Sequence, residues 1–272
     1  MTTRGRKTPR GKAKQKNTRA SLEWWLIAGA GVILVVVLVG GGIMASRSHP
    51  RPVATGGPPG SPPASPRTPI CRNFSPPQLQ AKILRSEAYP MTIDPKASYE
   101  AEITTSCGTM LVKLHAERAP IAVNNFVHLA KSDFYLGQVF HRIDRSLGVI
   151  QTGDPACPTS IQTCGTGGPG YTIPDEWPNG LKPHVGTVAM ASAGLPDTSG
   201  SQFEIIAGKS EYELPRERTI FGELVGRHSR QVARLILSIP TKRNPAAPSD
   251  APKDYPDGEF VYIMDIHIIK KG

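Results

Sequence analysis

The sequence predicts a mainly β fold: a closed antiparallel β-barrel capped by two α-helices and preceded by one transmembrane helix. Three features of the 272-residue chain point to it. Residues 24–44 contain no charged side chain. From residue 99 onward, short stretches alternate apolar and polar residues, and Gly, Pro and Asp separate them, as expected for half-buried strands. Only two stretches there have helical spacing, and closing such a sheet into a barrel removes its exposed edges.

The N-terminus predicts a basic tail followed by a membrane anchor. Residues 1–20 hold eight Lys or Arg and no acid, which leaves about +2 of the net charge of +10 for the rest of the chain. We therefore expect a basic cytoplasmic tail at 1–22 and no specific nucleic-acid partner. The 21 residues 24–44, within a predicted anchor at 23–45, would span about 30 Å of lipid bilayer as a helix.

A cleaved signal peptide is the alternative to a retained anchor. The apolar run is longer than the roughly 7–15 residues of a signal-peptide core, which favours retention. Positive charge before the anchor predicts a single-pass membrane protein with a cytoplasmic N-terminus and an extracytoplasmic C-terminal domain. Residues 46–69 are rich in Pro and Gly and predict an extended linker, and residues 70–98 form a transitional segment without an assigned function.

The predicted globular domain occupies residues 99–272. Tyr99, Ala101 and Ile103 alternate with polar residues and predict a strand, and residues 110–115 predict its antiparallel partner. A helix begins at Pro120, with its apolar side chains at helical spacing.

The second half of the domain contributes further predicted elements. Residues 137–143 form a strand, and a second helix at 230–239 ends at Pro240 because proline cannot continue a helix. Residues 260–269 form the closing strand.

Two motifs about 60 residues apart carry the functional information. The first is Phe140-His141-Arg142, followed by Gln151, and the second runs from Met190-Ala191-Ser192-Ala193-Gly194 to Gly200-Ser201-Gln202-Phe203. Together they resemble the signature stretches of the cyclophilin-type peptidyl-prolyl cis/trans isomerases. The resemblance extends from Tyr99 to the C-terminus and implies an eight-stranded closed barrel. The anchor and proline-rich stalk are similar to those of membrane-tethered cyclophilins of Gram-positive, especially actinobacterial, cells.

The resemblance implies a chemistry that needs neither a metal nor a cofactor. Arg142 would donate to the prolyl nitrogen and favour the twisted imide, and Gln151 and Gln202 would orient this arginine and bind substrate carbonyl groups. The backbone of Ala191, Ser192 and Ala193 would hold the peptide. The expected partners are proline-containing peptides or unfolded exported proteins, and the protein is expected to be a monomer.

The predicted proline pocket departs from the family. The family places apolar or aromatic groups before the first glutamine and after Gln202-Phe203, where this chain has Leu147, Val149 and Glu204. Arg218 stands where a His is usual, and Leu214 matches an apolar pocket residue. The remaining predicted substrate-binding residues are Phe140 and His141, and we expect His141 to be a packed, hydrogen-bonded ring because isomerisation needs no base.

A carboxylate in an apolar pocket is costly unless a cation pairs with it, and Arg218 and Arg142 are the two candidate partners. We therefore predict an isomerase with reduced or altered activity. The alternative is a tethered peptide-binding or chaperone module with little turnover.

The four cysteines predict two disulfides. Cys157 and Cys164 flank a short insertion beside the predicted groove, and we hypothesise that they pair with each other. A second pair, Cys71 with Cys107, would tie the end of the stalk to the first hairpin. Their spacing shows no CxxC pair, so zinc binding is disfavoured. An even number of cysteines fits a domain outside the cytoplasm.

Overall fold

The computed structural model describes residue 71 and residues 84–157, 159–160, 162–208, 218–244, 254–258 and 260–271. The predicted tail, anchor and linker lie outside these residues. No helix in the described part of the chain combines the length and apolar character needed to cross a membrane.

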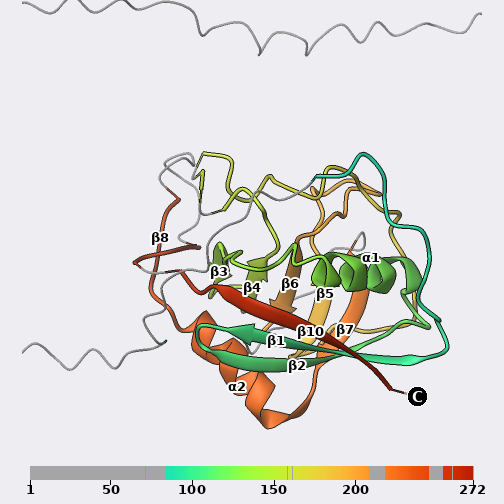
Figure 1. The fold of residues 1–272 in the computed structure, drawn as a ribbon. Helices are drawn as coiled ribbons and strands as arrows, with labels where there is room; N and C mark the ends of the chain where they lie inside the picture. Colours follow the sequence, from blue (N-terminus) through green and yellow to red (C-terminus); the bar gives the residue numbers. More distant parts are fainter. Residues whose placement is uncertain are drawn as a thin grey trace, which may run out of the picture. The chain divides into compact units, whose positions relative to one another are not determined.

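The domain is built around one curled antiparallel sheet of eight strands, in the order β10-β1-β2-β7-β5-β6-β4-β3 (Figure 1). The short strands β8 and β9 pair with each other in a separate two-stranded antiparallel sheet. The strands are β1 (Ser98–Thr105), β2 (Gly108–Leu114), β3 (Arg142–Asp144), β4 (Val149–Thr152), β5 (Thr187–Met190), β6 (Phe203–Ile206), β7 (Ile220–Leu224), β8 (Thr241–Lys242), β9 (Tyr255–Pro256) and β10 (Ile263–Lys271).

The predicted closed barrel is wrong, because the edge strands β3 and β10 do not pair with each other. Irregular backbone bridges them instead: Phe140 N donates to Val261 O at 3.0 Å, and Gly137 N donates to Ile263 O at 2.8 Å. We call this junction of residues 137–140 with residues 261–263 the seam. The strand predicted at 137–143 is replaced by β3 at Arg142–Asp144: Gly137 has a φ of +77°, outside the β region, and residues 137–140 make the irregular contacts of the seam.

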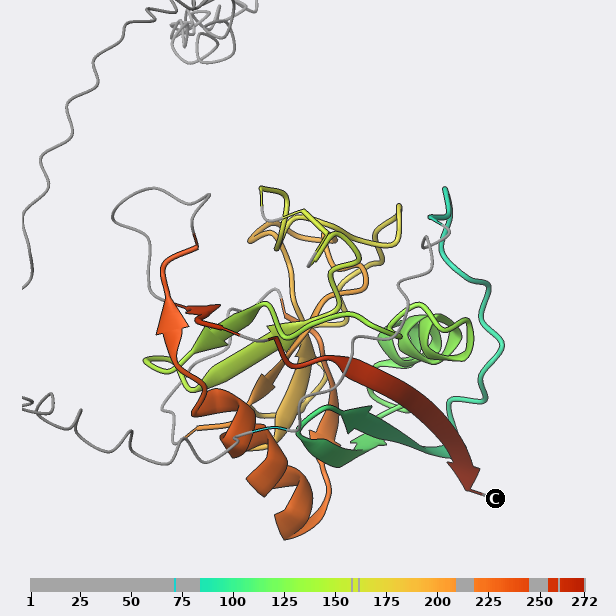
Figure 2. The same cartoon turned by 60° about the vertical axis from the view of Figure 1, so that its left-hand side comes forward.

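Two helices accompany the sheet, as predicted. The first is α1 (Pro120–Lys131) and the second is α2 (Gly226–Leu237), and they lie at opposite ends of the curled sheet (Figure 2). Helix α1 starts with Pro120 at its first turn, where a missing N–H costs nothing. Helix α2 begins four residues earlier than predicted and ends before Pro240.

Aromatic side chains fix α1 to the sheet. The Phe126 ring lies 5.3 Å from the Tyr135 ring, 5.5 Å from Phe203 in β6 and 5.3 Å from Phe221 in β7, measured between centroids. All four rings are buried. Such edge-to-face and tilted contacts, with their buried area, hold the helix against β6, which begins at the end of the second sequence motif, and against β7.

Candidate active site

Three polar side chains in or next to the two motifs form a row across the sheet. Arg142 in β3 is the register partner of Gln151 in β4, and Gln151 is in turn the partner of Glu204 in β6. Directly paired residues on neighbouring strands point to the same face of a sheet. The alternate positions, Ile150 and Ile205, point into the core and are fully buried. The sequence motifs are therefore brought together by strand register.

Two aspartates hold the Arg142 guanidinium. Its Nε donates to Asp254 Oδ2 at 2.9 Å and its Nη2 donates to Asp144 Oδ2 at 2.7 Å. Burial opposes the charge, but the hydrogen bond to Asp254 and the nearby charges of Asp144, Asp254 and Glu204 raise the pKa of Arg142 above its ordinary value. The guanidinium therefore stays protonated and is oriented by carboxylates, rather than by the two glutamines expected from the sequence.

Glu204 lies fully buried in the sheet and forms an ion pair with Arg218, one of the two partners expected for it. Arg218 precedes β7, and its side chain is 15% exposed. Burial raises the pKa of the Glu204 carboxyl, and the charges of Arg218 and Arg142 act in the opposite direction. A fully buried carboxylate thus has a largely buried cation beside it, at the position where the resemblance implies an apolar group.

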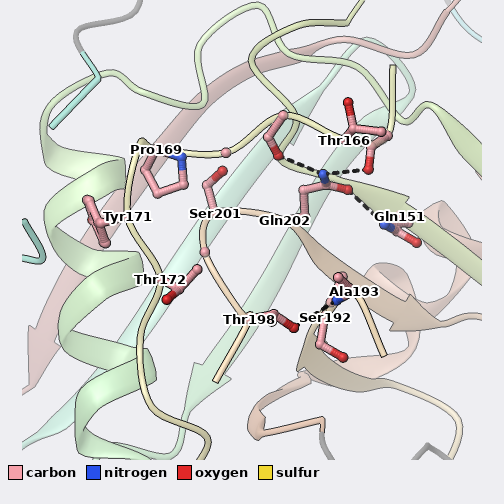
Figure 3. Close-up of a pocket in the computed structure, with 15 residues that line it drawn as sticks. Gln151, Thr166, Pro169, Tyr171, Thr172, Ser192, Ala193, Thr198, Ser201 and Gln202 are labelled. Atoms are coloured by element: carbon pink, nitrogen blue, oxygen red, sulfur yellow. Dashed lines mark hydrogen bonds between the residues drawn. The ribbon is translucent and has the colours of Figure 1, made fainter. Parts of the chain in front are cut away.

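Gln151 of the row and the nearby Gln202 line one wall of a groove (Figure 3). Gln151 Nε2 donates to Gln202 Oε1 at 2.8 Å, and Gln202 Nε2 donates to the carbonyl oxygens of Gly165 at 2.9 Å and Gly167 at 2.8 Å. The cavity measures about 330 Å³ and is lined by Gln151, Gly165, Thr166, Gly167, Gly168, Pro169, Tyr171, Thr172, Ala191, Ser192, Ala193, Thr198, Gly200, Ser201 and Gln202. The segment predicted to hold the peptide backbone, residues 191–193, thus forms part of this groove.

The glycine-rich wall of the groove is organised by Asp154, which sequence reasoning missed. This buried carboxylate accepts hydrogen bonds from the backbone N–H groups of Ala156, Gly165 and Gly167. The Cys157–Cys164 disulfide closes the loop between these contacts. Asp154 follows Gln151 by three residues, and its closeness to the first motif was the available signal.

The structure also locates the other predicted site residues. Phe140 and Val149 are fully buried, and Leu147 is half-buried in the turn after β3. Leu214 lies outside the described residues. Cys71 and Cys107 are disulfide-bonded, with their Cα atoms 4.4 Å apart. No group of three or more His, Cys, Asp or Glu side chains in the described ranges is arranged to hold a metal ion.

His141 is a buried ring, as expected, but neither ring nitrogen has a hydrogen bond of regular geometry within the described residues. Desolvation lowers the pKa of His141, and the nearby charge of Asp154 only partly offsets this effect. The ring is therefore neutral at physiological pH, which fits a packing role and does not suggest a catalytic base.

Comparison with known proteins identifies the family. A family model described as "Cyclophilin type peptidyl-prolyl cis-trans isomerase/CLD" matches residues 101–254. Peptidyl-prolyl cis-trans isomerase A of Mycobacterium tuberculosis is 37% identical over 172 residues, which cover 57% of this chain and 88% of that protein. Peptidyl-prolyl cis-trans isomerase B of Streptomyces anulatus is 36% identical over 159 residues, or 52% of this chain and 85% of that one.

Solved structures agree with the sequence comparison. A cyclophilin-type peptidyl-prolyl cis-trans isomerase of Cryptosporidium parvum superposes with a TM-score of 0.52 and 27% identity, covering 64% of this chain and 99% of its own. The chain belongs to the cyclophilin-type peptidyl-prolyl cis-trans isomerase family, and its enzyme class is peptidyl-prolyl cis-trans isomerase.

Two neighbouring glycines in the glycine-rich wall provide a test variant and its matched control. A Cβ at Gly167 would overlap with Oδ1 of Asp154, whereas a Cβ at Gly168 would meet nothing within 4 Å. We expect Gly167→Ala to weaken peptide binding at least fivefold and to destabilise the domain by about 1–3 kcal/mol. Gly168→Ala should leave both nearly unchanged, as measured by peptide titration and urea unfolding. Equal effects of the two substitutions would contradict the assigned role of Asp154.

Burial of neutral His141 predicts a loss of stability in acid. Its pKa is lowered in the folded state, so below the unfolded value of about 6.5 the unfolded chain binds a proton that the folded chain does not. The free energy of unfolding should therefore fall by up to about 1.4 kcal/mol per pH unit as the pH drops from 6.5 toward the folded pKa. His141→Gln should remove this part of the slope, measured by urea unfolding between pH 5 and 8. The stability difference between the two proteins should stay constant above pH 7, and a constant difference at every pH would refute the prediction.

Proposed function

We propose that this isomerase acts through Arg142. The imide bond has a rotation barrier of about 18–20 kcal/mol because the nitrogen lone pair takes part in amide resonance. A hydrogen-bond donor aimed at the prolyl nitrogen stabilises the twisted, pyramidal state in which that lone pair has left the resonance. The observation that carries this proposal is the guanidinium itself: permanently charged, fixed on one edge by two aspartates, and next to Gln151 of the groove.

The substrates proposed for this site are proline-containing peptide segments. The groove offers the Gln151–Gln202 pair, the carbonyl-lined glycine loop and residues 191–193, which together present donors and acceptors to an extended backbone. One related Cryptosporidium parvum cyclophilin structure, 29% identical with a TM-score of 0.50 and covering 63% of this chain and 99% of its own, was determined in the presence of the dipeptide Ala-Pro. We carry that substrate class to this chain as part of the proposal.

The proposed activity is reduced or altered in specificity because of the Glu204–Arg218 pair. A proline ring is apolar, and a buried ion pair at its predicted site offers polar contacts that the ring cannot satisfy. The pair also supports the second candidate function, a peptide-binding or chaperone module that retains the groove but has little turnover. Orientation of Arg142 by two carboxylates favours the isomerase over the peptide-binding module.

We place the domain outside the cytoplasm, acting as a membrane-tethered monomer on exported proteins. The uncharged run at 24–44 and the basic residues before it support the anchor and its orientation. The two disulfides support an oxidising compartment, since such bonds rarely persist in the cytosol.

The role of Arg142 is tested by isomerisation rates measured by NMR exchange on the full-length protein. Arg142→Ala should lower kcat/KM by about 100-fold, the cost typical of removing one preorganised donor. Arg145→Ala is the matched control, because Arg145 is a nearby arginine that bonds only to Thr241 Oγ1 in the described chain. If the wild-type protein gives no acceleration, or Arg142→Ala keeps it, the catalytic assignment fails.

The altered pocket is tested by restoring the family's usual residues. Glu204→Phe combined with Arg218→His removes both charges together, so that neither partner is left alone in the buried site. We expect this double variant to bind proline peptides more tightly and to raise kcat/KM about tenfold, as one buried apolar contact of about 1.5 kcal/mol would. Affinity and rate equal to those of the wild type would show that the ion pair does not limit the pocket.

A further inference from the structure

Asp254 reaches the site from a distant part of the chain. It lies 112 residues after Arg142, immediately before β9, and its backbone oxygen accepts a hydrogen bond from Ile143 N at 2.6 Å. This contact fixes Asp254 along the outer edge of β3, next to the residue whose side chain it holds. Its position is therefore set by the backbone and does not depend on the arginine.

Asp254 and Asp144 share one edge of the guanidinium. Nε and Nη2 carry the N–H groups of that edge, and each donates to a different carboxylate. An arginine has five N–H donors, so the opposite edge, which carries Nη1, remains for the peptide. Among the described residues, the Arg142 side chain donates its hydrogen bonds to these two aspartates.

The two aspartates differ in how tightly they are held. Asp144 Oδ1 accepts hydrogen bonds from Ser146 Oγ at 2.6 Å, Ser146 N at 3.1 Å and Leu147 N at 3.0 Å, which form the turn after β3. Asp144 therefore has a structural function in that turn in addition to its bond with Arg142. In the described chain, the Asp254 carboxylate is hydrogen-bonded to Arg142 alone.

A third carboxylate competes for the same arginine. Glu204 lies on the same sheet face as Arg142, two strands away, and the two charges interact. Because a guanidinium on a flexible side chain moves toward the strongest available acceptor, loss of the Nε contact would allow Arg142 to turn toward Glu204.

We propose that Asp254 is a positioning residue for the isomerisation: it fixes Nε of Arg142 so that the Nη1 edge faces the peptide. This inference rests on the proposed catalytic role of Arg142. Asp254 touches neither peptide nor reacting atoms and acts only through the arginine.

The test uses substitutions of Asp254 in the full-length protein. Asp254→Ala should lower kcat about tenfold with KM changed less than twofold, because a small misplacement of a catalytic donor costs rate more than binding. Asp254→Asn keeps an oxygen acceptor of the same size and should recover most of the rate. Asp257→Asn is the matched control, since Asp257 lies three residues further on and pairs with Lys242 at the surface.

A second readout separates positioning from folding. The ¹⁵N–¹H signal of Arg142 Nε in the resting protein should be protected from solvent exchange in wild type and Asp257→Asn, and lose that protection in Asp254→Ala. Wild-type kcat in Asp254→Ala, or an unchanged Nε signal, overturns the inference. The inference is also overturned if both Asp254 variants have a lower rate and a lower melting temperature accounts for that loss. Loss of rate in Arg142→Ala with none in Asp254→Ala rejects the positioning role alone, whereas full activity of Arg142→Ala rejects the proposed function itself.

Discussion

Strands β3, β4 and β6 carry an apolar layer on one face and a polar row on the other, and the site depends on this division. Ile143, Ile150 and Ile205 pack in the core, while Arg142, Gln151 and Glu204 stand on the opposite face. The register cannot slip by one residue without moving the charged row into the core and the isoleucines out of it. The burial of apolar side chains on one face therefore holds the functional groups of the other face in line.

This arrangement places charges where water is scarce. Glu204 is fully buried, and its ion pair with Arg218 compensates part of the cost of removing the carboxylate from water. Because Glu204 pairs with Arg218, Arg142 pairs with Asp144 and Asp254 instead. If Arg218 were absent, Arg142 would be the remaining cation that acts on Glu204, and its guanidinium would be drawn along the row. Arg218 and Glu204, which both depart from the family's usual residues, are thus linked because the charge of one compensates the charge of the other.

Much of the domain could be predicted from the sequence, because the decisive interactions are local or belong to recognised motifs. Alternation in residues 99–114 gave the first hairpin, Pro120 gave the start of α1, and the motifs brought Arg142, Gln151 and Gln202 to one region. The cost of a buried carboxylate predicted a cationic partner for Glu204 and left Arg218 and Arg142 as candidates, of which the structure shows Arg218. Asp254 could not be found in this way, since no spacing or periodicity links residues 112 positions apart. Likewise, residues 137–140 make tertiary contacts at the seam, with Gly137 at a positive φ, and the local alternation could not show this.

The irregular outer edge of β3 and the orientation of Arg142 are two aspects of one feature. In a fully closed barrel the outer edge of β3 would pair with a neighbouring strand, and Ile143 N would donate to that strand. Here Ile143 N donates to Asp254 O, and the side chain of the same aspartate meets Nε of Arg142. Closing the sheet by regular pairing at β3 would thus displace the residue that orients the arginine. The error in the predicted fold and the missing residue in the predicted site have a common cause: the backbone hydrogen bond at this edge is made to a distant loop rather than to a strand.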